Sequence, residues 1–146
     1  MRAVVQRVSR ASVEVDGRIV GEIERGLLLL VAVAADDEPA TADRLADRVI
    51  GCRLHNDEAG KINVATKDLE GAALLAVSNF TVLGDASTGR RPSFAKSAGF
   101  EKGKELFDRF VAACRERGVR TETGEFGADM RVALVNDGPV TLVLEA

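Results

Sequence analysis

The chain has 146 residues, 46% of them apolar, and a formal net charge of −3. This length and composition predict a single domain over residues 1–146 with its own core, and the acidic balance argues against a protein that tracks a long duplex. The longest apolar run, Leu27 to Ala35, has nine residues, fewer than the ~20 of a membrane helix, and no signal peptide is visible. The expected location is therefore cytoplasmic, with no membrane partner.

The first part of the chain predicts strands. Val13 and Val15 alternate with polar residues, as in a short half-buried strand, and Asp16-Gly17 is a two-residue hairpin signal. Arg18 to Ile23 is then the return strand. Leu27 to Ala34 is continuously apolar, which favours a strand buried on both faces.

Two segments have the apolar spacing of helices. The first runs from Pro39 to Cys52, and either Asp36 or Asp37 can cap its N-terminus. The second runs from Glu101 to Arg117 and precedes Gly118, a residue typical of helix C-termini. Both helices are amphipathic, so each is expected to pack one face on the rest of the protein.

The other elements are short and extended. The pattern predicts a hairpin-like piece, a buried strand and three closing strands, at Asn56 to Lys61, Ala73 to Val77, Arg120 to Thr123, Met130 to Val135 and Val140 to Glu145. The predicted fold class is therefore α+β, a mainly antiparallel sheet or barrel-like core with two packed helices.

The irregular segment from Leu83 to Gly99 is rich in Gly, Ser and Arg. A loop of this length in a small protein is usually functional or mobile. The overlapping stretch from Thr88 to Lys104 carries five cations and one anion. This local positive charge is suited to contact with a few phosphates of a nucleic acid. A solvent-exposed loop with no ligand can have the same composition. With no Trp or Tyr, stacking of several bases is not expected, but Phe can hold one base.

Conventional hydrolytic groups are nearly absent. The single histidine, His55, is expected to be a surface or capping residue at a strand end, and Cys52 and Cys114 are expected to be core thiols. The sequence has neither the ligand spacing of a zinc site nor a phosphate-cradling glycine loop. An enzyme with this sequence must use positioning and main-chain donors, and a group on the substrate itself is a further available source of catalysis. Ser78 and Thr81 stand at a strand end, where hydroxyls contact a ligand or satisfy free backbone groups.

Near the end of the chain, Gly138-Pro139 lies between the apolar runs Val132 to Val135 and Val140 to Leu144. Proline has no N–H group and cannot continue a central ladder, and glycine has no side chain. The pair either forms a plain β-turn joining two strands or exposes main-chain carbonyls in an unusual shape. A cis bond before proline is possible in either case.

Four stretches together resemble the D-aminoacyl-tRNA deacylase family over the whole chain. They are Met1 to Val8, Gly89 to Phe94, Phe126 to Met130 and Asn136 to Thr141. The resemblance implies a cytosolic homodimer with its active site at the subunit interface. Its reaction would hydrolyse the ester between a D-amino acid, or mischarged glycine, and the terminal adenosine of tRNA. Main-chain groups and the substrate 2′-hydroxyl would assist, and no cofactor would be needed.

Residue roles follow from the same resemblance. Gly138-Pro139 would be a cis motif that enters the partner pocket and excludes L-amino acids, held in place by Arg7. Ser78 and Thr81 would position the ester, with Thr81 not acting as a nucleophile. The remaining substrate contacts would come from Asn79, Phe80, Phe126 and Met130. From its charge, the segment around Arg90 and Arg91 is expected to face the tRNA backbone.

Asn79 departs from the family, which has Gln at this position of its Ser-Gln-x-Thr motif. A contact through the Asn79 backbone N–H is favoured, because the shorter side chain would then change little. Two alternatives remain open: a non-catalytic protein that binds the tRNA 3′ end, and an editing subunit of the same fold that works with a synthetase.

Overall fold

The computed structural model describes residues 1–146, and its longest paired strands are β1 (Arg2–Val15) and β8 (Arg131–Glu145). The short strand expected around Val13 and Val15 is therefore wrong in extent, since β1 has 14 residues. One edge of β1 pairs with β2 (Arg18–Ile23) and then β3 (Gly26–Ala32), and β8 pairs with the other edge. A central strand such as β1 forms hydrogen bonds with segments that are distant in the sequence. The alternation of apolar and polar residues within the strand does not show how far that pairing extends.

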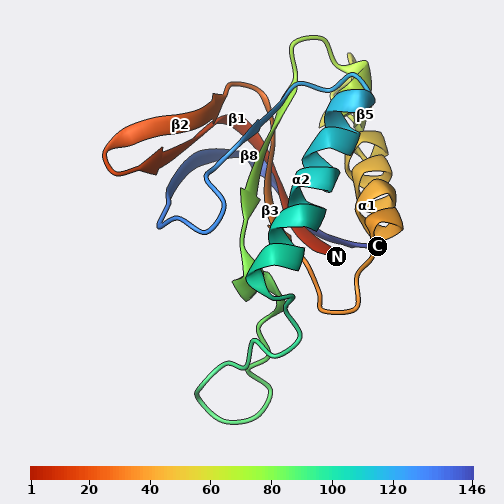
Figure 1. The fold of residues 1–146 in the computed structure, drawn as a ribbon. Coiled ribbons are helices and arrows are strands. Elements are labelled where there is room, and N and C mark those ends of the chain that lie inside the picture. The colour runs from red at the N-terminus through yellow and green to blue at the C-terminus, as the bar shows by residue number, and fades with distance from the viewer.

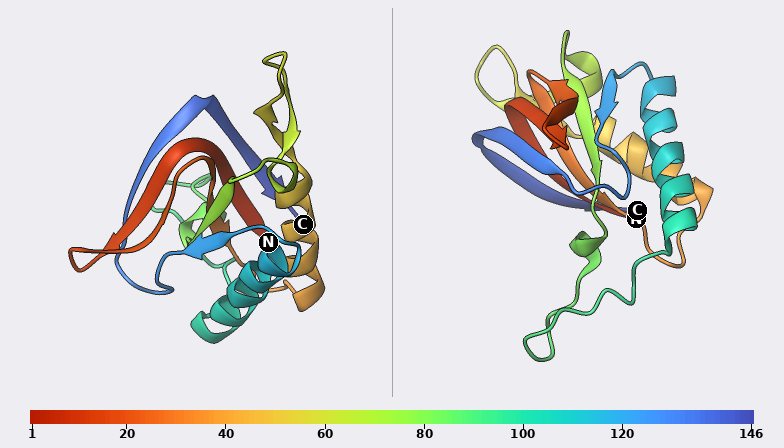
Figure 2. Two further views of the ribbon diagram at one scale, coloured as in Figure 1. Left: turned by 90° about the horizontal axis from the view of Figure 1, so that it is seen from above. Right: turned by 60° about the vertical axis from the view of Figure 1, so that its left-hand side comes forward.

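The sheet continues from β3 through β6 (Ala73–Ser78) to β7 (Thr121–Thr123), and both of these added pairings are parallel. It curls strongly, as Figure 2 shows, until β7 approaches β2. A Cβ atom built on Gly21 of β2 would lie 2.3 Å from the Thr123 carbonyl oxygen. The expected fold class is confirmed: the core is a curled, barrel-like sheet in which the three pairings of β1 are antiparallel.

Helices α1 (Pro39–Gly51) and α2 (Phe100–Glu116) lie side by side and cover one face of the sheet (Figure 1). Their apolar faces join the larger core around Leu45 and Phe110. The N-terminal cap of α1 is Glu38, whose backbone N–H donates to the Thr41 hydroxyl. The expected cap at Asp36 or Asp37 is wrong, because the Asp37 carboxylate instead accepts from the Ala34 N–H and the Met1 ammonium.

The second sheet is a hairpin of β4 (Arg53–Asn56) and β5 (Ile62–Ala65), followed by the 3₁₀ turn η1 (Thr66–Asp68). Asp57 closes the hairpin turn: its backbone N–H bonds the Lys61 carbonyl, and its carboxylate accepts from the N–H groups of Ala59 and Lys61. The predicted hairpin-like piece is thus confirmed and has a rigid end.

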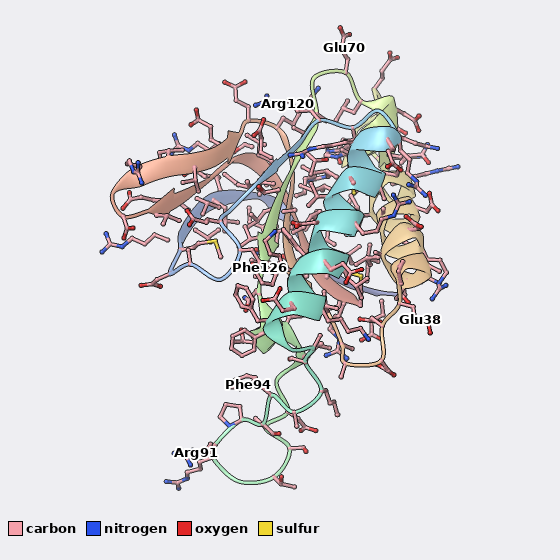
Figure 3. The ribbon with its side chains drawn as sticks, viewed as in Figure 1. Glu38, Glu70, Arg91, Phe94, Arg120 and Phe126 are labelled. Atoms are coloured by element: carbon pink, nitrogen blue, oxygen red, sulfur yellow. The ribbon has the colours of Figure 1, made fainter.

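After β6 come the 3₁₀ turn η2 (Phe80–Leu83) and a protruding loop with Arg91 near its tip (Figure 3). Asp85 and Ser93 exchange two backbone hydrogen bonds at the loop base. The Asp85 carboxylate accepts from Ser87 and Lys96, and these bonds lower its pKa to about 2. The predicted irregular segment is confirmed, and its base is held by charge-assisted bonds that persist at neutral pH.

The Gly138–Pro139 peptide bond is cis. The pair does not form a turn between two strands, because both sides of it pair with β1 in the same antiparallel direction. Gln6 is opposite Thr141 and Val8 is opposite Asn136, which leaves residues 137–140 opposite Arg7 alone. We call residues 137–140 the β8 bulge. The plain-turn reading is therefore wrong: the extra residues are a bulge within one strand.

Candidate active site

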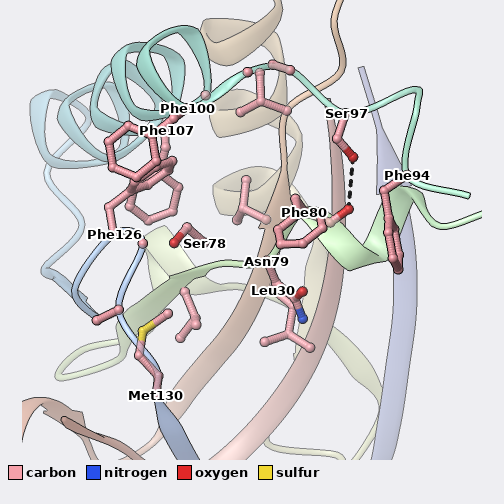
Figure 4. A pocket seen from close by; sticks show the side chains of 18 of the residues that line it. Leu30, Ser78, Asn79, Phe80, Phe94, Ser97, Phe100, Phe107, Phe126 and Met130 are labelled. Carbon is pink, nitrogen blue, oxygen red and sulfur yellow. Dashed lines mark hydrogen bonds between the residues drawn. The ribbon is translucent and has the colours of Figure 1, made fainter. Parts of the chain in front are cut away.

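A mainly apolar cavity of about 660 Å³ lies where β3 and β6 end beneath the N-terminus of α2. Five of the predicted site residues line it: Ser78, Asn79, Phe80, Phe126 and Met130. Figure 4 shows the Ser78 hydroxyl directed into this space between aromatic side chains. Val31 and Ser78 are register partners in parallel strands, so pairing places both strand ends at the same edge of the sheet.

Aromatic rings flank the cavity on two sides (Figure 4). Phe126 packs against Phe100 and Phe107, with ring centroids 5.2 and 5.8 Å away. On the other side, Phe80 and Phe94 meet edge to face at 5.2 Å. Phe80 and Phe100 remain more than half exposed. Exposed ring faces beside an apolar cavity can stack on a planar ligand such as a nucleobase.

The turn after β6 is closed by its own polar groups. The Asn79 side-chain oxygen accepts from the Thr81 N–H at 3.2 Å and from the Thr81 hydroxyl. The Asn79 backbone N–H donates to the Val31 carbonyl at 2.8 Å. The favoured substrate contact through that N–H is therefore wrong, because the sheet already uses the group. Phe80, the first residue of η2, has an N–H that the turn cannot satisfy.

Arg7 is nearly buried and binds the base of the β8 bulge. Its Nε donates to the Asp137 carbonyl at 2.9 Å, and its Nη1 donates to the Leu54 carbonyl at 2.9 Å and to Asn56 Oδ1 at 3.0 Å. The Asp137 carboxylate lies 3.6 Å from Nε. Arg7 therefore contacts the segment that contains Gly138. That it holds Gly138-Pro139 in place for substrate selection stays a prediction.

The neck of the β8 bulge is closed by Asn136. Its side-chain oxygen accepts from the Val140 N–H at 3.0 Å, and its Nδ2 donates to the Thr141 hydroxyl at 2.8 Å. Gly138 has a φ of +134°, and a Cβ atom built there would lie 3.0 Å from Arg7 Nη2. The bulge is thus a fixed shape that requires glycine at this position.

The predicted site residues fall into two separate groups. Arg7 is in register with Leu27 and Leu74, four residues before Ser78 along β6. At about 3.3 Å per residue this is roughly 13 Å along the strand direction. Val132, near the start of β8, lines the cavity, whereas Gly138 and Pro139 further along the same strand do not. Thr81 stands outside the cavity lining, and Arg90 and Arg91 are exposed in the loop after η2. One chain therefore does not unite Gly138 and Pro139 with its own cavity.

Several residues line the cavity that no sequence motif had marked as part of a site. Phe94, Ser97, Phe100 and Phe107 all line the cavity. The Ser97 hydroxyl donates to the Phe80 carbonyl at 3.1 Å, which joins the returning loop to η2. One feature of the sequence could have indicated a site here: Phe100 is an aromatic residue at the start of a helix and directly follows the irregular segment.

His55 is buried, with only 3% of its surface exposed, and its Nε2 lies 3.0 Å from the Thr66 hydroxyl oxygen. The expectation of a surface or capping histidine is wrong, because η1 folds back over β4. Burial lowers the pKa of His55 below 6.5, and the nearby Arg7 charge lowers it further. His55 is therefore neutral near pH 7.

We expect this burial to make the protein acid-sensitive. The unfolded chain takes up a proton at His55 near pH 6.5, whereas the folded protein resists it until lower pH. The contribution of neutral His55 to the free energy of unfolding should be fully present above pH 6.5. It should be lost as the pH falls below 6.5. Urea titrations at pH 7.5 and 5.5 measure this loss. His55→Gln, which cannot titrate, should lose less stability over that interval, and an equal loss in both proteins would contradict the assignment.

No cluster of three or more His, Cys, Asp or Glu side chains is placed to hold a metal ion. Cys114 is buried, which raises the pKa of its thiol to about 12, and Cys52 is half-buried. None of the helices combines the length and hydrophobicity needed to span a bilayer.

A family model and individual relatives match nearly the whole chain, and both are described as tRNA deacylases. The family model described as D-Tyr-tRNA(Tyr) deacylase matches residues 4–145. The chain is 54% identical to the D-aminoacyl-tRNA deacylase of Koribacter versatilis and 51% identical to that of Thermosipho africanus, in each case over 100% of this chain and 97% of the relative.

Two solved structures share the fold. One, described as the c-Myc DNA Unwinding Element Binding Protein, superposes with a TM-score of 0.93 at 34% identity, covering 100% of this chain and 99% of the other. The other, a probable eukaryotic D-amino acid tRNA deacylase, has a TM-score of 0.86 at 17% identity, covering 99% and 98%. On the family match and the full-length identities, the chain belongs to the D-aminoacyl-tRNA deacylase family.

Proposed function

We propose that this enzyme, acting in the cytoplasm without a cofactor, hydrolyses the ester between a D-amino acid and the terminal adenosine of tRNA. Glycine wrongly attached to tRNA is a second substrate. The observation that carries the proposal is the cavity that unites Ser78, Phe80 and Phe126 in a chain of this family. A cavity of about 660 Å³ is large enough for an aminoacyl-adenosine end.

The chemistry proposed for the cavity relies on preorganised donors. The adenine stacks against exposed Phe rings, which brings the ester to the strand end at Ser78. The Phe80 N–H stabilises the oxyanion that forms when water attacks the carbonyl carbon. The 2′-hydroxyl of the substrate assists proton transfer, and the electron pair of the broken C–O bond leaves on the adenosine oxygen. No protein acid–base pair is needed for this scheme.

Thr81 is proposed to position the turn and not to act as a nucleophile. Its hydroxyl donates to Asn79, and no base lies beside it. Thr81→Ala should lower kcat for D-aminoacyl-tRNA by about tenfold, the effect of losing one hydrogen bond of about 1.4 kcal/mol, and leave measurable turnover. Single-turnover kinetics test this. A trapped aminoacyl ester on Thr81 would show instead that it is the nucleophile.

The active unit is proposed to be a homodimer in which each β8 bulge completes the partner's cavity. Two observations support this: residues 137–140 do not line the cavity of their own chain, and the outer edge of β8 pairs with no other strand. Val135, Leu142 and Val143 on β8 are also exposed. Unpaired apolar edge strands tend to associate with a second chain, and a two-fold arrangement would create two equivalent sites.

In the dimer, the main chain of Gly138 and Pro139 would stand where the side chain of an L-amino acid points. D and L substrates carry the same groups, so only a fixed obstacle can separate them. Glycine has no side chain to clash, which explains why the same obstacle would not reject it. Sedimentation equilibrium should give about twice the 15.5 kDa chain mass. A fully active monomer would exclude the shared site.

Arg90 and Arg91 are proposed to contact phosphates of the acceptor stem. Both are exposed in the protruding loop, which extends beyond the N-terminal end of α2 with Arg91 near its tip (Figure 3). The double variant Arg90→Gln/Arg91→Gln should raise KM and reduce the slope of log KM against log salt concentration by about 1.5, as expected for two lost phosphate contacts. Arg18→Gln/Arg48→Gln removes the same charge from distant exposed positions and should leave the slope unchanged. Equal effects of both doubles would refute a specific loop contact.

The deciding experiment compares deacylation of D-aminoacyl-, L-aminoacyl- and glycyl-tRNA by the purified protein. We expect release of D-amino acids and glycine and retention of L-aminoacyl-tRNA. Binding of all three without hydrolysis would favour the non-catalytic tRNA-end reading. Hydrolysis only after addition of a synthetase would favour an editing subunit.

A further inference from the structure

We infer that Asn56 is a positioning residue for chiral selection, because it fixes Arg7 and Arg7 fixes the β8 bulge. Asn56 does not line the cavity described above. The inference rests on the proposed role of Gly138 and Pro139, and it adds a residue that acts through Arg7.

The guanidinium of Arg7 is shared between two structural units. Its Nε bonds the Asp137 carbonyl of the bulge, whereas its Nη1 bonds the Leu54 carbonyl and Asn56 Oδ1, both on β4. Strand β4 belongs to the separate two-stranded sheet and not to the main sheet. Arg7 is therefore the polar link through which the β4–β5 hairpin sets the position of the bulge.

Asn56 is the only side chain outside β8 that accepts a hydrogen bond from Arg7. Its own position is fixed on both sides: His55 is anchored to Thr66, and Asp57 closes the following turn. The guanidinium group of Arg7 is planar, and acceptors on β8 and β4 bind its Nε and Nη1 atoms. These bonds fix the orientation of the guanidinium plane. Loss of Oδ1 leaves only the Leu54 carbonyl on the β4 side, about which the guanidinium can pivot.

A pivot of Arg7 would act directly on the bulge. Arg7 Nη2 lies 3.0 Å from the position that a Cβ atom on Gly138 would occupy, so the guanidinium is in contact with the glycine backbone. No other residue of β1 faces the bulge, since Gln6 and Val8 pair with residues on either side of it. Movement of the guanidinium therefore changes the main-chain surface that the substrate would meet.

The test measures the ratio of kcat/KM for D- and L-aminoacyl-tRNA in Asn56→Ala, Asn56→Asp and the wild type. This ratio does not depend on the fraction of protein that is correctly folded, so a general loss of stability does not alter it. We expect Asn56→Ala to lower the D/L ratio at least tenfold, and Asn56→Asp, which keeps the acceptor oxygen, to restore most of it. Asn63→Ala, on the same hairpin, removes the acceptor for Arg53 and a long bond of 3.5 Å to the Asp57 carboxylate. It leaves the contacts of Arg7 and the two backbone bonds to the Asp57 carboxylate in place, so the ratio should be unchanged.

Hydrogen–deuterium exchange separates failure of this inference from failure of the proposed function. Peptides covering residues 136–141 should exchange faster in Asn56→Ala than in the wild type or Asn63→Ala, whatever the substrate. Unchanged exchange in those peptides, or an unchanged D/L ratio in Asn56→Ala, would overturn the positioning role. Wild-type protein without D-selectivity would refute the proposed function, while the exchange result would still decide whether Asn56 holds the bulge.

Discussion

Gly138→Ala is expected to lower kcat/KM for D-aminoacyl-tRNA by about 100-fold while the protein remains folded. The added methyl group would meet the Val140 N and Cγ2 atoms at 2.9 Å and Arg7 Nη2 at 3.0 Å, at a φ of +134°. The bulge must shift to relieve these contacts, and a displacement of about 1 Å in a positioning element can cost about 100-fold in rate. Backbone strain should cost about 1–3 kcal/mol of the free energy of unfolding.

Gly71→Ala is the matched control for this variant. Gly71 also has a positive φ, +73°, but nothing lies within 4 Å of its Cβ position. It should show the strain cost without the loss of activity. Wild-type kcat/KM in Gly138→Ala would mean that the bulge takes no part in catalysis.

Mixed dimers can then show whose cavity the bulge serves. Gly103 lines the cavity, so Gly103→Leu would fill it without touching the bulge. If each bulge serves the partner, dimers that combine Gly138→Ala with Gly103→Leu contain one intact site. Random mixing should then restore about one quarter of wild-type activity from two nearly inactive proteins. No recovery would show that the bulge acts within its own chain.

Gly26→Ala is expected to reduce the free energy of unfolding by at least about 3 kcal/mol, the upper range for overpacking. A Cβ atom on Gly26 would lie 1.8 Å from the Ala73 carbonyl oxygen and 2.9 Å from its nitrogen. These are backbone atoms of β6, which cannot rotate away as a side chain would. The substitution must therefore separate the first residues of β3 and β6, the strands whose other ends bring Val31 beside Ser78.

Gly51→Ala should have the opposite effect. Gly51 ends α1, and nothing lies within 4 Å of its Cβ position. The alanine should raise the free energy of unfolding by about 0.4–1 kcal/mol, because it restricts the unfolded chain without a clash. Guanidinium titrations of both variants measure the contrast. Similar stabilities for the two would show that β3 and β6 can separate without cost.

Elements set by neighbouring residues were predictable from the sequence. The predicted Pro39 to Cys52 helix is observed as Pro39–Gly51, and Glu101 to Arg117 as Phe100–Glu116. The hairpin signal Asp16-Gly17 forms a turn with positive φ at both residues. In each case the deciding interactions, helical spacing or turn torsions, lie within a few residues of one another.

The site was predictable only in part. The strand end at Ser78 and the residues Phe126 and Met130 do converge on one cavity, as the family resemblance implied. The sequence did not indicate that the Asn79 N–H would be used by Val31, or that Phe94 and Phe100 would form opposite walls. The first fact depends on the pairing of β6 with β3, and the second on how the loop returns past η2 to the start of α2. No local pattern specifies either.

The sequence by itself determined the two helices, the first hairpin and the absence of a conventional acid–base set. The tertiary structure alone decided that β8 is one strand with a bulge opposite Arg7, and that His55 is buried between Thr66 and the Arg7 cluster. The physical reason is the range of the interactions. Helical and turn preferences act over a few residues, whereas the partners of Arg7 come from segments 47, 49 and 130 residues away along the chain.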